Sequence, residues 1–106
     1  MSKENYDVEF EGEPVKLGKK TYIIAGLSFA QAERLAPVID EIGKNQGKTL
    51  NAKLINNICV VLHAAISRNY PNITLEEVKD LVDLKNAQKV FGAVMGASGF
   101  EIQAGN

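Results

Sequence analysis

Near the start of the chain, apolar and polar residues alternate in two short runs, at residues 15–17 and 21–24. Gly18 follows the first run. The two runs with this glycine between them are typical of a β-hairpin whose turn holds two or three residues. A Glu-Gly-Glu-Pro run at 11–14 predicts a further turn before the hairpin. Because two strands alone are marginally stable in water, one face of this hairpin is expected to pack on helices or on another chain.

From residue 28 the apolar spacing changes to that of an α-helix. Ser28 and Gln31 predict a capping box at its start. The expected buried stripe consists of Ala32, Leu35, Ala36, Ile39 and Ile42. Pro37 predicts a kink, or a break that starts a second short helix, because proline has no N–H for the helical ladder. Gly43 is the expected C-cap, and a polar connection follows over residues 44–48.

The most apolar helix is predicted to begin near residues 49–51 and to end near 69. Its main stripe is Leu54, Ile58, Val61, Leu62 and Ala65, widened by Ile55, Cys59 and Ile66. Residues 58–62 are apolar almost all round, which places this helix at the centre of the predicted core. Its polar side is a narrow line of Lys53, Asn56, His63 and Ser67, on which Val60 also lies.

Two shorter helices are predicted after Tyr70 and Pro71. The first, over residues 74–84, begins with a Thr74–Glu77 capping box and a hydrophobic staple between Ile73 and Val78. Its expected buried residues are Leu75, Val78, Leu81 and Val82. The second is expected to be capped by Asn86 and to bury Ala87, Val90, Phe91, Val94 and Met95.

Together these elements predict a mainly α fold, a small bundle of about four helices preceded by an N-terminal β-hairpin. A single domain is expected over residues 8–100, with flexible ends at 1–7 and 101–106 and fraying from Gly96 and Gly99 onwards. The chain of 106 residues has 13 acidic and 12 basic side chains, a net charge of −1. This balance favours neither nucleic acid nor an anionic membrane as a partner.

A cytoplasmic protein is expected, because residues 1–7 are polar and no apolar run approaches the roughly 20 residues of a membrane helix. The single Cys59 excludes an internal disulfide. Cys59 and His63 are four residues apart on one helix, a spacing that suits a thiolate–imidazole pair or two metal ligands. The competing interpretation is that Cys59 is a core residue and His63 borders solvent.

Acidic residues decorate the helix over 74–84, namely Glu76, Glu77, Asp80 and Asp83. They suit a divalent-ion site, an acidic docking surface or simply a solvated face. The glycines at 92, 96 and 99 have the spacing of close helix contacts and lack the lysine of a phosphate loop. We expect no catalytic, cofactor or metal residues, and we identify as candidate partner contacts Val60, His63, Glu76, Asp80, Asp83 and Tyr22.

The order of the elements resembles the tail assembly chaperones of long-tailed phages and prophages over roughly residues 14–100. The segments that carry this resemblance are 27–37, 63–74, 81–87 and 94–100. Its most specific pieces are Arg68-Asn69-Tyr70-Pro71 with Thr74, and the Asp83-Leu84-x-Asn86 joint.

The resemblance implies a non-catalytic helper in the bacterial host cytoplasm that is absent from the mature virion. It would bind the tape measure protein, keep it soluble and help recruit tail tube protein. The family commonly makes a longer form by ribosomal frameshifting, and this chain would correspond to the short form. The client's exposed apolar stripes need cover until the tube forms, and grooves between helices would supply it.

We also expect a homo-oligomer, formed through the free hairpin edge or the Val60 side of the central helix. Two other classes remain open. One is a small tail structural or completion protein that oligomerises in the virion, and the other is a small enzyme.

Overall fold

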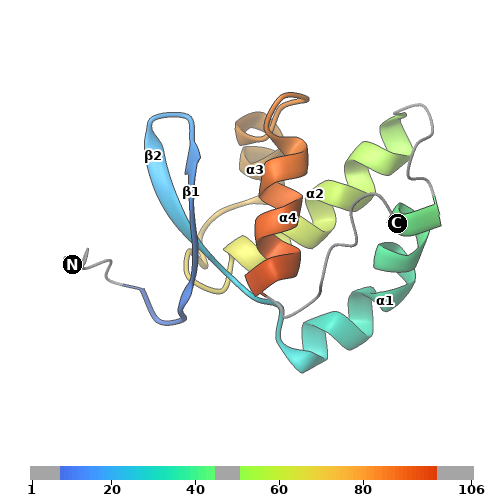
Figure 1. Ribbon diagram of the computed structural model, residues 1–106, viewed down its shortest axis with the longest axis horizontal. Coiled ribbons are helices and arrows are strands. Elements are labelled where there is room, and N and C mark those ends of the chain that lie inside the picture. The colour runs from blue at the N-terminus through green and yellow to red at the C-terminus, as the bar shows by residue number, and fades with distance from the viewer. Residues whose placement is uncertain (1–7, 45–50, 98–106) are drawn as a thin grey trace.

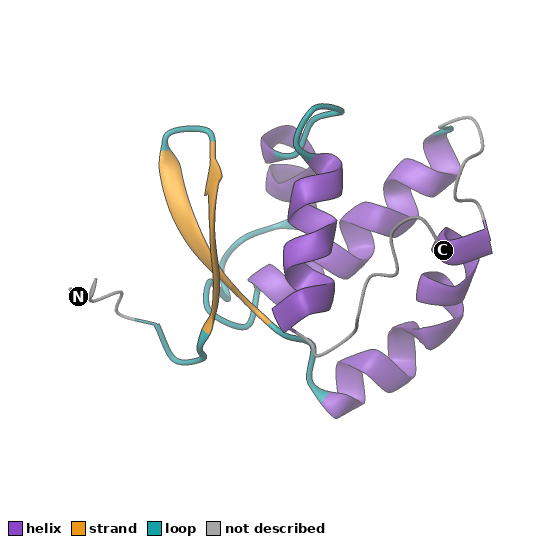
Figure 2. Ribbon diagram, viewed as in Figure 1, coloured by secondary structure: helices purple, strands orange, loops and turns teal. Residues whose placement is uncertain are grey.

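The computed structural model describes residues 8–44 and 51–97. Their elements are β1 (Gly12–Leu17), β2 (Lys20–Ala25), α1 (Phe29–Lys44), α2 (Ala52–Ile66), α3 (Leu75–Leu81) and α4 (Ala87–Ala97). Figure 1 shows α4 in front of α2, with the hairpin to one side and α1 to the other. The fold is therefore mainly α, with four helices and an N-terminal antiparallel hairpin, as expected from the sequence (Figure 2).

The hairpin is closed by a two-residue turn, because Leu17 pairs directly with Lys20. Gly18 has φ 68° and no other described residue has a positive φ, which fits a type II′ turn with glycine at its first central position. The turn expected at residues 11–14 is wrong, because its last three residues form the start of β1.

Gly12 and Pro14 are accommodated in β1 for different reasons. A Cβ at Gly12 would lie 2.1 Å from the carbonyl oxygen of Ile24, so only glycine permits this approach of the strands. Pro14 pairs with Ile23, whose N–H and C=O both bond side chains outside the hairpin. The N–H that proline lacks is therefore not needed by the ladder.

Helix α2 is the centre of the core, as predicted. It packs against α1, α3, α4 and β2, while α4 also covers both strands. Val61, Leu62 and Ile66 of α2 are completely buried. Ile58 is only partly buried, and Ile55 is 40% exposed, so the expected widening of the stripe does not extend to Ile55.

The first helix corrects three expectations. Helix α1 runs unbroken through Pro37, so the alternative of a break is wrong. Glu33 and Pro37 are both exposed, so the Glu33 carbonyl, which loses its helical donor, lies on the solvent side of the helix. Gly43 lies inside the helix, which continues to Lys44. Ala36 is exposed, because the buried side is narrow and centres on Leu35 and Ile42.

The starts of α1, α2 and α3 follow the predicted signals. Ser28 and Gln31 bond each other's backbone N–H groups, both at 3.1 Å. Asn51 caps α2 by accepting from the N–H of Leu54 at 2.8 Å. Thr74 and Glu77 form the expected capping box of α3.

Two helix ends lie earlier than predicted. Helix α2 ends at Ile66 and α3 at Leu81, and in each case a turn follows. Of the four residues expected to be buried on the α3 segment, only Val78 is fully buried. The other three, Leu75, Leu81 and Val82, are half-buried because so short a helix covers only part of the core.

The joint between α3 and α4 reverses the expected roles of Asp83 and Asn86. The Asp83 carboxylate accepts from the N–H groups of Lys85 and Asn86, at 2.9 and 2.8 Å. Asn86 reaches back to the N–H of Asp83 at 2.9 Å. Asp83 is therefore the cap of the turn that leads into α4. Within α4, Val90, Val94 and Met95 are buried as predicted.

Several expectations lie outside the described residues. They concern the flexible ends, the polar connection over 45–48 and the fraying at Gly99. Among the residues that the structure describes, no helix is both long and apolar enough to cross a membrane.

Candidate partner-binding site

The Arg68-Asn69-Tyr70 segment after α2 fastens the hairpin to the helices. Asn69 bonds both backbone groups of Phe10: its Oδ1 accepts from the N–H, and its Nδ2 donates to the C=O, each at 2.8 Å. The same Nδ2 donates to the carbonyl of Ile23 at 3.0 Å. The Asn69 side chain thus hydrogen-bonds the backbone of two separate segments, as a neighbouring β-strand would.

Tyr70 completes this attachment at the outer edge of β2. Its hydroxyl accepts from the N–H of Ile23 at 2.9 Å. Its ring meets the ring of Tyr22 edge to face, with centroids 5.1 Å apart and an interplanar angle of 73°. The Nζ of Lys20 lies 5.0 Å from the Tyr22 centroid and 5.3 Å from that of Tyr70, which places the ammonium over both rings.

Arg68 holds the two ends of the hairpin together. Its guanidinium donates to the carbonyl of Gly26 at 2.6 Å, just after β2. The same group lies 4.0 Å from the ring centroid of Phe10, just before β1. The Arg68-Asn69-Tyr70 segment, which the local sequence pattern predicts as the end of a helix, is therefore the connection between the hairpin and the helical part.

A surface hollow of about 420 Å³ lies between β2 and the start of α3. We call it the tyrosine hollow. The residues that line it include Lys20, Tyr22, Tyr70, Pro71, Ile73 and Glu77. Within the described residues Lys20 makes no ion pair. Glu77 is occupied, because its carboxylate accepts from the N–H and hydroxyl of Thr74.

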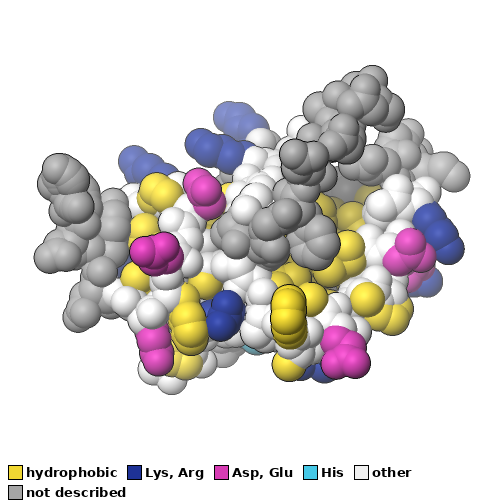
Figure 3. Space-filling model, turned by 60° about the horizontal axis from the view of Figure 1, so that its bottom comes forward, with side chains coloured by type: hydrophobic (Ala, Val, Ile, Leu, Met, Phe, Trp, Pro, Cys, Tyr) yellow, Lys and Arg dark blue, Asp and Glu magenta, His cyan; other side chains and the backbone are white. Residues whose placement is uncertain are grey.

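Among the described residues, two large apolar side chains are strongly exposed, and neither was predicted from the sequence. Phe29 is 95% exposed at the start of α1, and Leu84 is 76% exposed in the turn before α4. Phe29 lies off the stripe formed by Leu35, Ile39 and Ile42, a signal that was available from the helical spacing. Figure 3 shows hydrophobic groups separated by charged side chains on the face that carries the start of α1.

The six candidate contact residues differ in burial and in their bonding partners. Tyr22 lies in the tyrosine hollow. Val60 is half-buried and packs against the core, so it is a weaker contact candidate than its place on the polar line suggested. His63 is also half-buried, and its Nε2 lies 3.0 Å from the carbonyl oxygen of Ile73. This contact requires the Nε2–H tautomer, with the carbonyl as acceptor.

The acidic candidates are all exposed, but their surroundings differ. Glu76 and Asp80 lie on the surface of α3. Asp83 is exposed too, although its carboxylate is engaged in capping the turn into α4. Among the described residues, no group of three or more His, Cys, Asp or Glu side chains could hold a metal ion.

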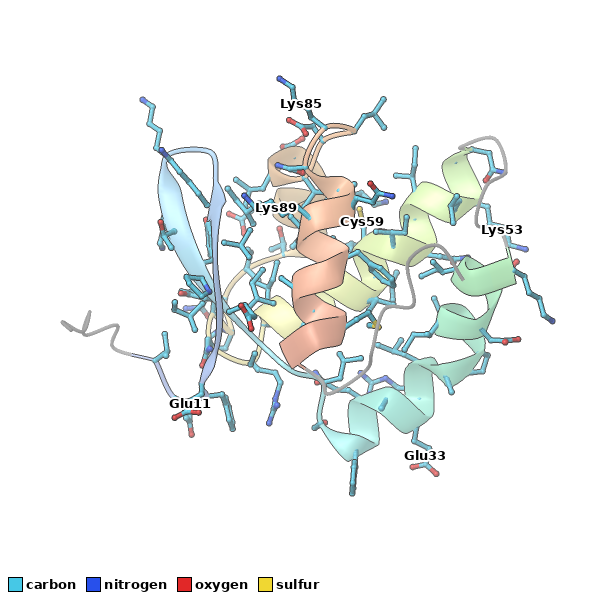
Figure 4. All side chains as sticks on the ribbon, viewed as in Figure 1. Glu11, Glu33, Lys53, Cys59, Lys85 and Lys89 are labelled. Carbon is cyan, nitrogen blue, oxygen red and sulfur yellow. The ribbon has the colours of Figure 1, made fainter. Side chains whose placement is uncertain are left out.

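The Cys59–His63 pair shows the features of the core interpretation. Cys59 is buried on α2 at 4% exposure (Figure 4). Burial raises the pKa of its thiol above the ordinary value, and the positive charge of Lys79 opposes this rise. A raised pKa keeps the thiol protonated, whereas a nucleophile or metal ligand needs the thiolate. His63 points its Nε2 to a backbone carbonyl instead.

The arrangement as a whole offers surfaces for contact with another molecule: the tyrosine hollow and the exposed side chains of Phe29 and Leu84. Comparisons of the chain with protein-family models, curated proteins and solved structures found no match.

Proposed function

We propose that this protein is a non-catalytic assembly chaperone of phage or prophage tails, acting in the host cytoplasm. It binds the tape measure protein, keeps it soluble until the tube forms and helps recruit tail tube protein. The proposal begins from the sequence resemblance. One structural observation carries it further: two large apolar residues within the segments of that resemblance, Phe29 and Leu84, are exposed to solvent.

Neither residue contributes to the core that the remaining apolar residues build. Glu33, one turn after Phe29, lies at the bottom of the view in Figure 4, and Lys85, next to Leu84, lies at the top. A client that touches both has to reach across the molecule, as a long amphipathic segment can. Its apolar stripe would meet single apolar side chains spaced along the chaperone.

The test is co-expression with a phage tape measure protein. Wild-type protein is expected to raise the soluble fraction of the client. Phe29→Ser and Leu84→Ser, alone and combined, are expected to lower it, and neither change removes a core contact. Ala30→Ser, at an exposed neighbouring position, serves as the matched control. A client that stays insoluble with wild-type protein, or full activity of the double variant, would contradict the proposal.

The alternative is a small tail structural or completion protein that oligomerises through its hairpin edge. Two contacts argue against that route. At Ile23 the edge of β2 is already bonded to Asn69 and Tyr70, and on β1 Pro14 has no N–H to offer. Purified virions distinguish the two functions, since the chaperone is expected to be absent from them and the structural protein present.

A further inference from the structure

We propose that the tyrosine hollow binds a segment of a partner protein that presents a carboxylate beside an apolar side chain. The carboxylate would meet the ammonium of Lys20, and the apolar side chain would meet Tyr22, Tyr70 and Pro71. This inference rests on the hollow alone and is independent of the proposed chaperone function.

The ammonium of Lys20 is the group in the hollow that can bind an acidic ligand. Lys20 is exposed and makes no ion pair within residues 8–44 and 51–97, and its Nζ is held over two rings. Glu77, the acid on the opposite wall, already accepts from the N–H and hydroxyl of Thr74. The Glu77 carboxylate is therefore already hydrogen-bonded, whereas the Lys20 ammonium contacts two rings but has no carboxylate partner among the described residues.

The apolar half of the hollow is fixed in place before any ligand arrives. Tyr70 cannot swing away without losing its hydrogen bond to Ile23, and the Tyr22 ring packs edge to face against it. Rigid tyrosines lose little conformational entropy on binding, which is why they are frequent at the centres of protein interfaces.

The shape of the hollow favours a protein partner over the other classes. It opens widely to solvent, whereas a small-molecule pocket encloses most of its ligand. Stacking of a nucleobase requires a free aromatic face. Here the two rings meet at 73° and the ammonium of Lys20 lies over both. The tyrosine hollow therefore best fits a side chain or a short segment that projects from another protein.

Titration of the full-length, ¹⁵N-labelled protein with two matched synthetic peptides tests the proposal. One peptide carries Glu beside Phe, and the other carries Gln in place of that Glu. The Glu peptide is expected to shift the amide resonances of residues 20–22, 70 and 72–77. It is expected to bind roughly tenfold more tightly than the Gln peptide, because only Glu supplies the ionised acceptor. Added salt should narrow this difference.

Lys20→Gln is expected to abolish the preference for the Glu peptide. Lys16→Gln is the matched control, because Lys16 is exposed on the same hairpin and pairs with Thr21 rather than lining the hollow. Equal binding of the two peptides, or shifts confined to other parts of the molecule, would overturn the proposal. So would an oligothymidylate that shifts the hollow resonances when the Glu peptide does not. Client solubility with Lys20→Gln is a separate measurement, so either proposal can fail without the other.

Discussion

At the scale of single residues, Asn69 determines how the hairpin is attached. Its amide group bonds the N–H and C=O of Phe10 and the C=O of Ile23. A carboxamide is suited to this role because it carries a donor and an acceptor side by side, as a peptide group does. Aspartate has the same shape but lacks the donor, so it could satisfy only the Phe10 N–H.

Asn69→Ala is expected to lower the free energy of unfolding by about 1–3 kcal/mol, because it leaves three part-buried backbone groups without their partner. Urea unfolding monitored by circular dichroism measures the loss. Asn72→Ala, at an exposed position of the next turn, should change stability by less than about 0.5 kcal/mol. Similar losses for both variants would show that the Asn69 bonds contribute little.

At the scale of elements, α2 organises the core, but its apolar residues are not equivalent. Leu62 is completely buried, whereas Ile58 is only partly buried on the same helix. The sequence treats them alike, because both fall on the predicted stripe. The structure separates them by how much of each side chain the hairpin, α1, α3 and α4 cover.

Leu62→Ala is expected to cost about 2–5 kcal/mol of stability, since it removes buried contacts and leaves a cavity. Ile58→Ala should cost clearly less, because solvent already reaches that site. Chemical denaturation of both variants gives the comparison. Equal losses would contradict the difference in burial between the two sites. A loss below about half a kcal/mol for Leu62→Ala would contradict the central position of α2.

Local patterns predicted most elements of the fold because each depends on neighbouring residues. The capping pairs Ser28–Gln31 and Thr74–Glu77 are separated by three positions and form as expected. The turn expected at 11–14 failed because pairing with β2 overrides the turn preference of its glycine and proline. Asn86 was predicted as the cap of the last helix, but the local pattern did not show that Asp83 caps the turn while Asn86 bonds back to its N–H.

The site was less predictable, because it depends on contacts between distant parts of the chain. Tyr22 was identified as a candidate contact residue, whereas Tyr70 was predicted to end a helix and was named only as part of the motif that carries the resemblance. Nothing in the local pattern brings residue 69 to residues 10 and 23. Phe29 is the exception, since its position off the apolar stripe was visible in the spacing.

At the scale of the whole molecule, stability is expected to depend on pH through Cys59. The pKa of this thiol is raised by burial in the fold, so the folded protein keeps the proton that the unfolded chain releases. The stability that the protonated thiol contributes to the folded state is fully present below the ordinary thiol pKa. It is lost as pH rises through the raised value of the folded state.

Urea unfolding at neutral and alkaline pH tests this expectation. Wild-type protein should lose more stability on the alkaline side than Cys59→Ala, whose other titrating groups are the same. The thiol should also react slowly with Ellman's reagent until the protein unfolds, because Cys59 is only 4% exposed. Parallel pH profiles, or rapid labelling of the native protein, would contradict this account.

The attachment of the hairpin by Asn69 has a consequence for synthesis of the chain. Asn69 is added 59 residues after Phe10. At about 5–20 residues per second, the ribosome needs roughly 3–12 seconds to span that interval. For most of that interval the hairpin, which is complete at Ala25, lacks the residues that fasten it, and its apolar face lacks its helical cover. The segment that is made first is therefore fastened late. A nascent chain that stalls before residue 69 carries an undocked hairpin, which can associate with other nascent chains on the same messenger RNA.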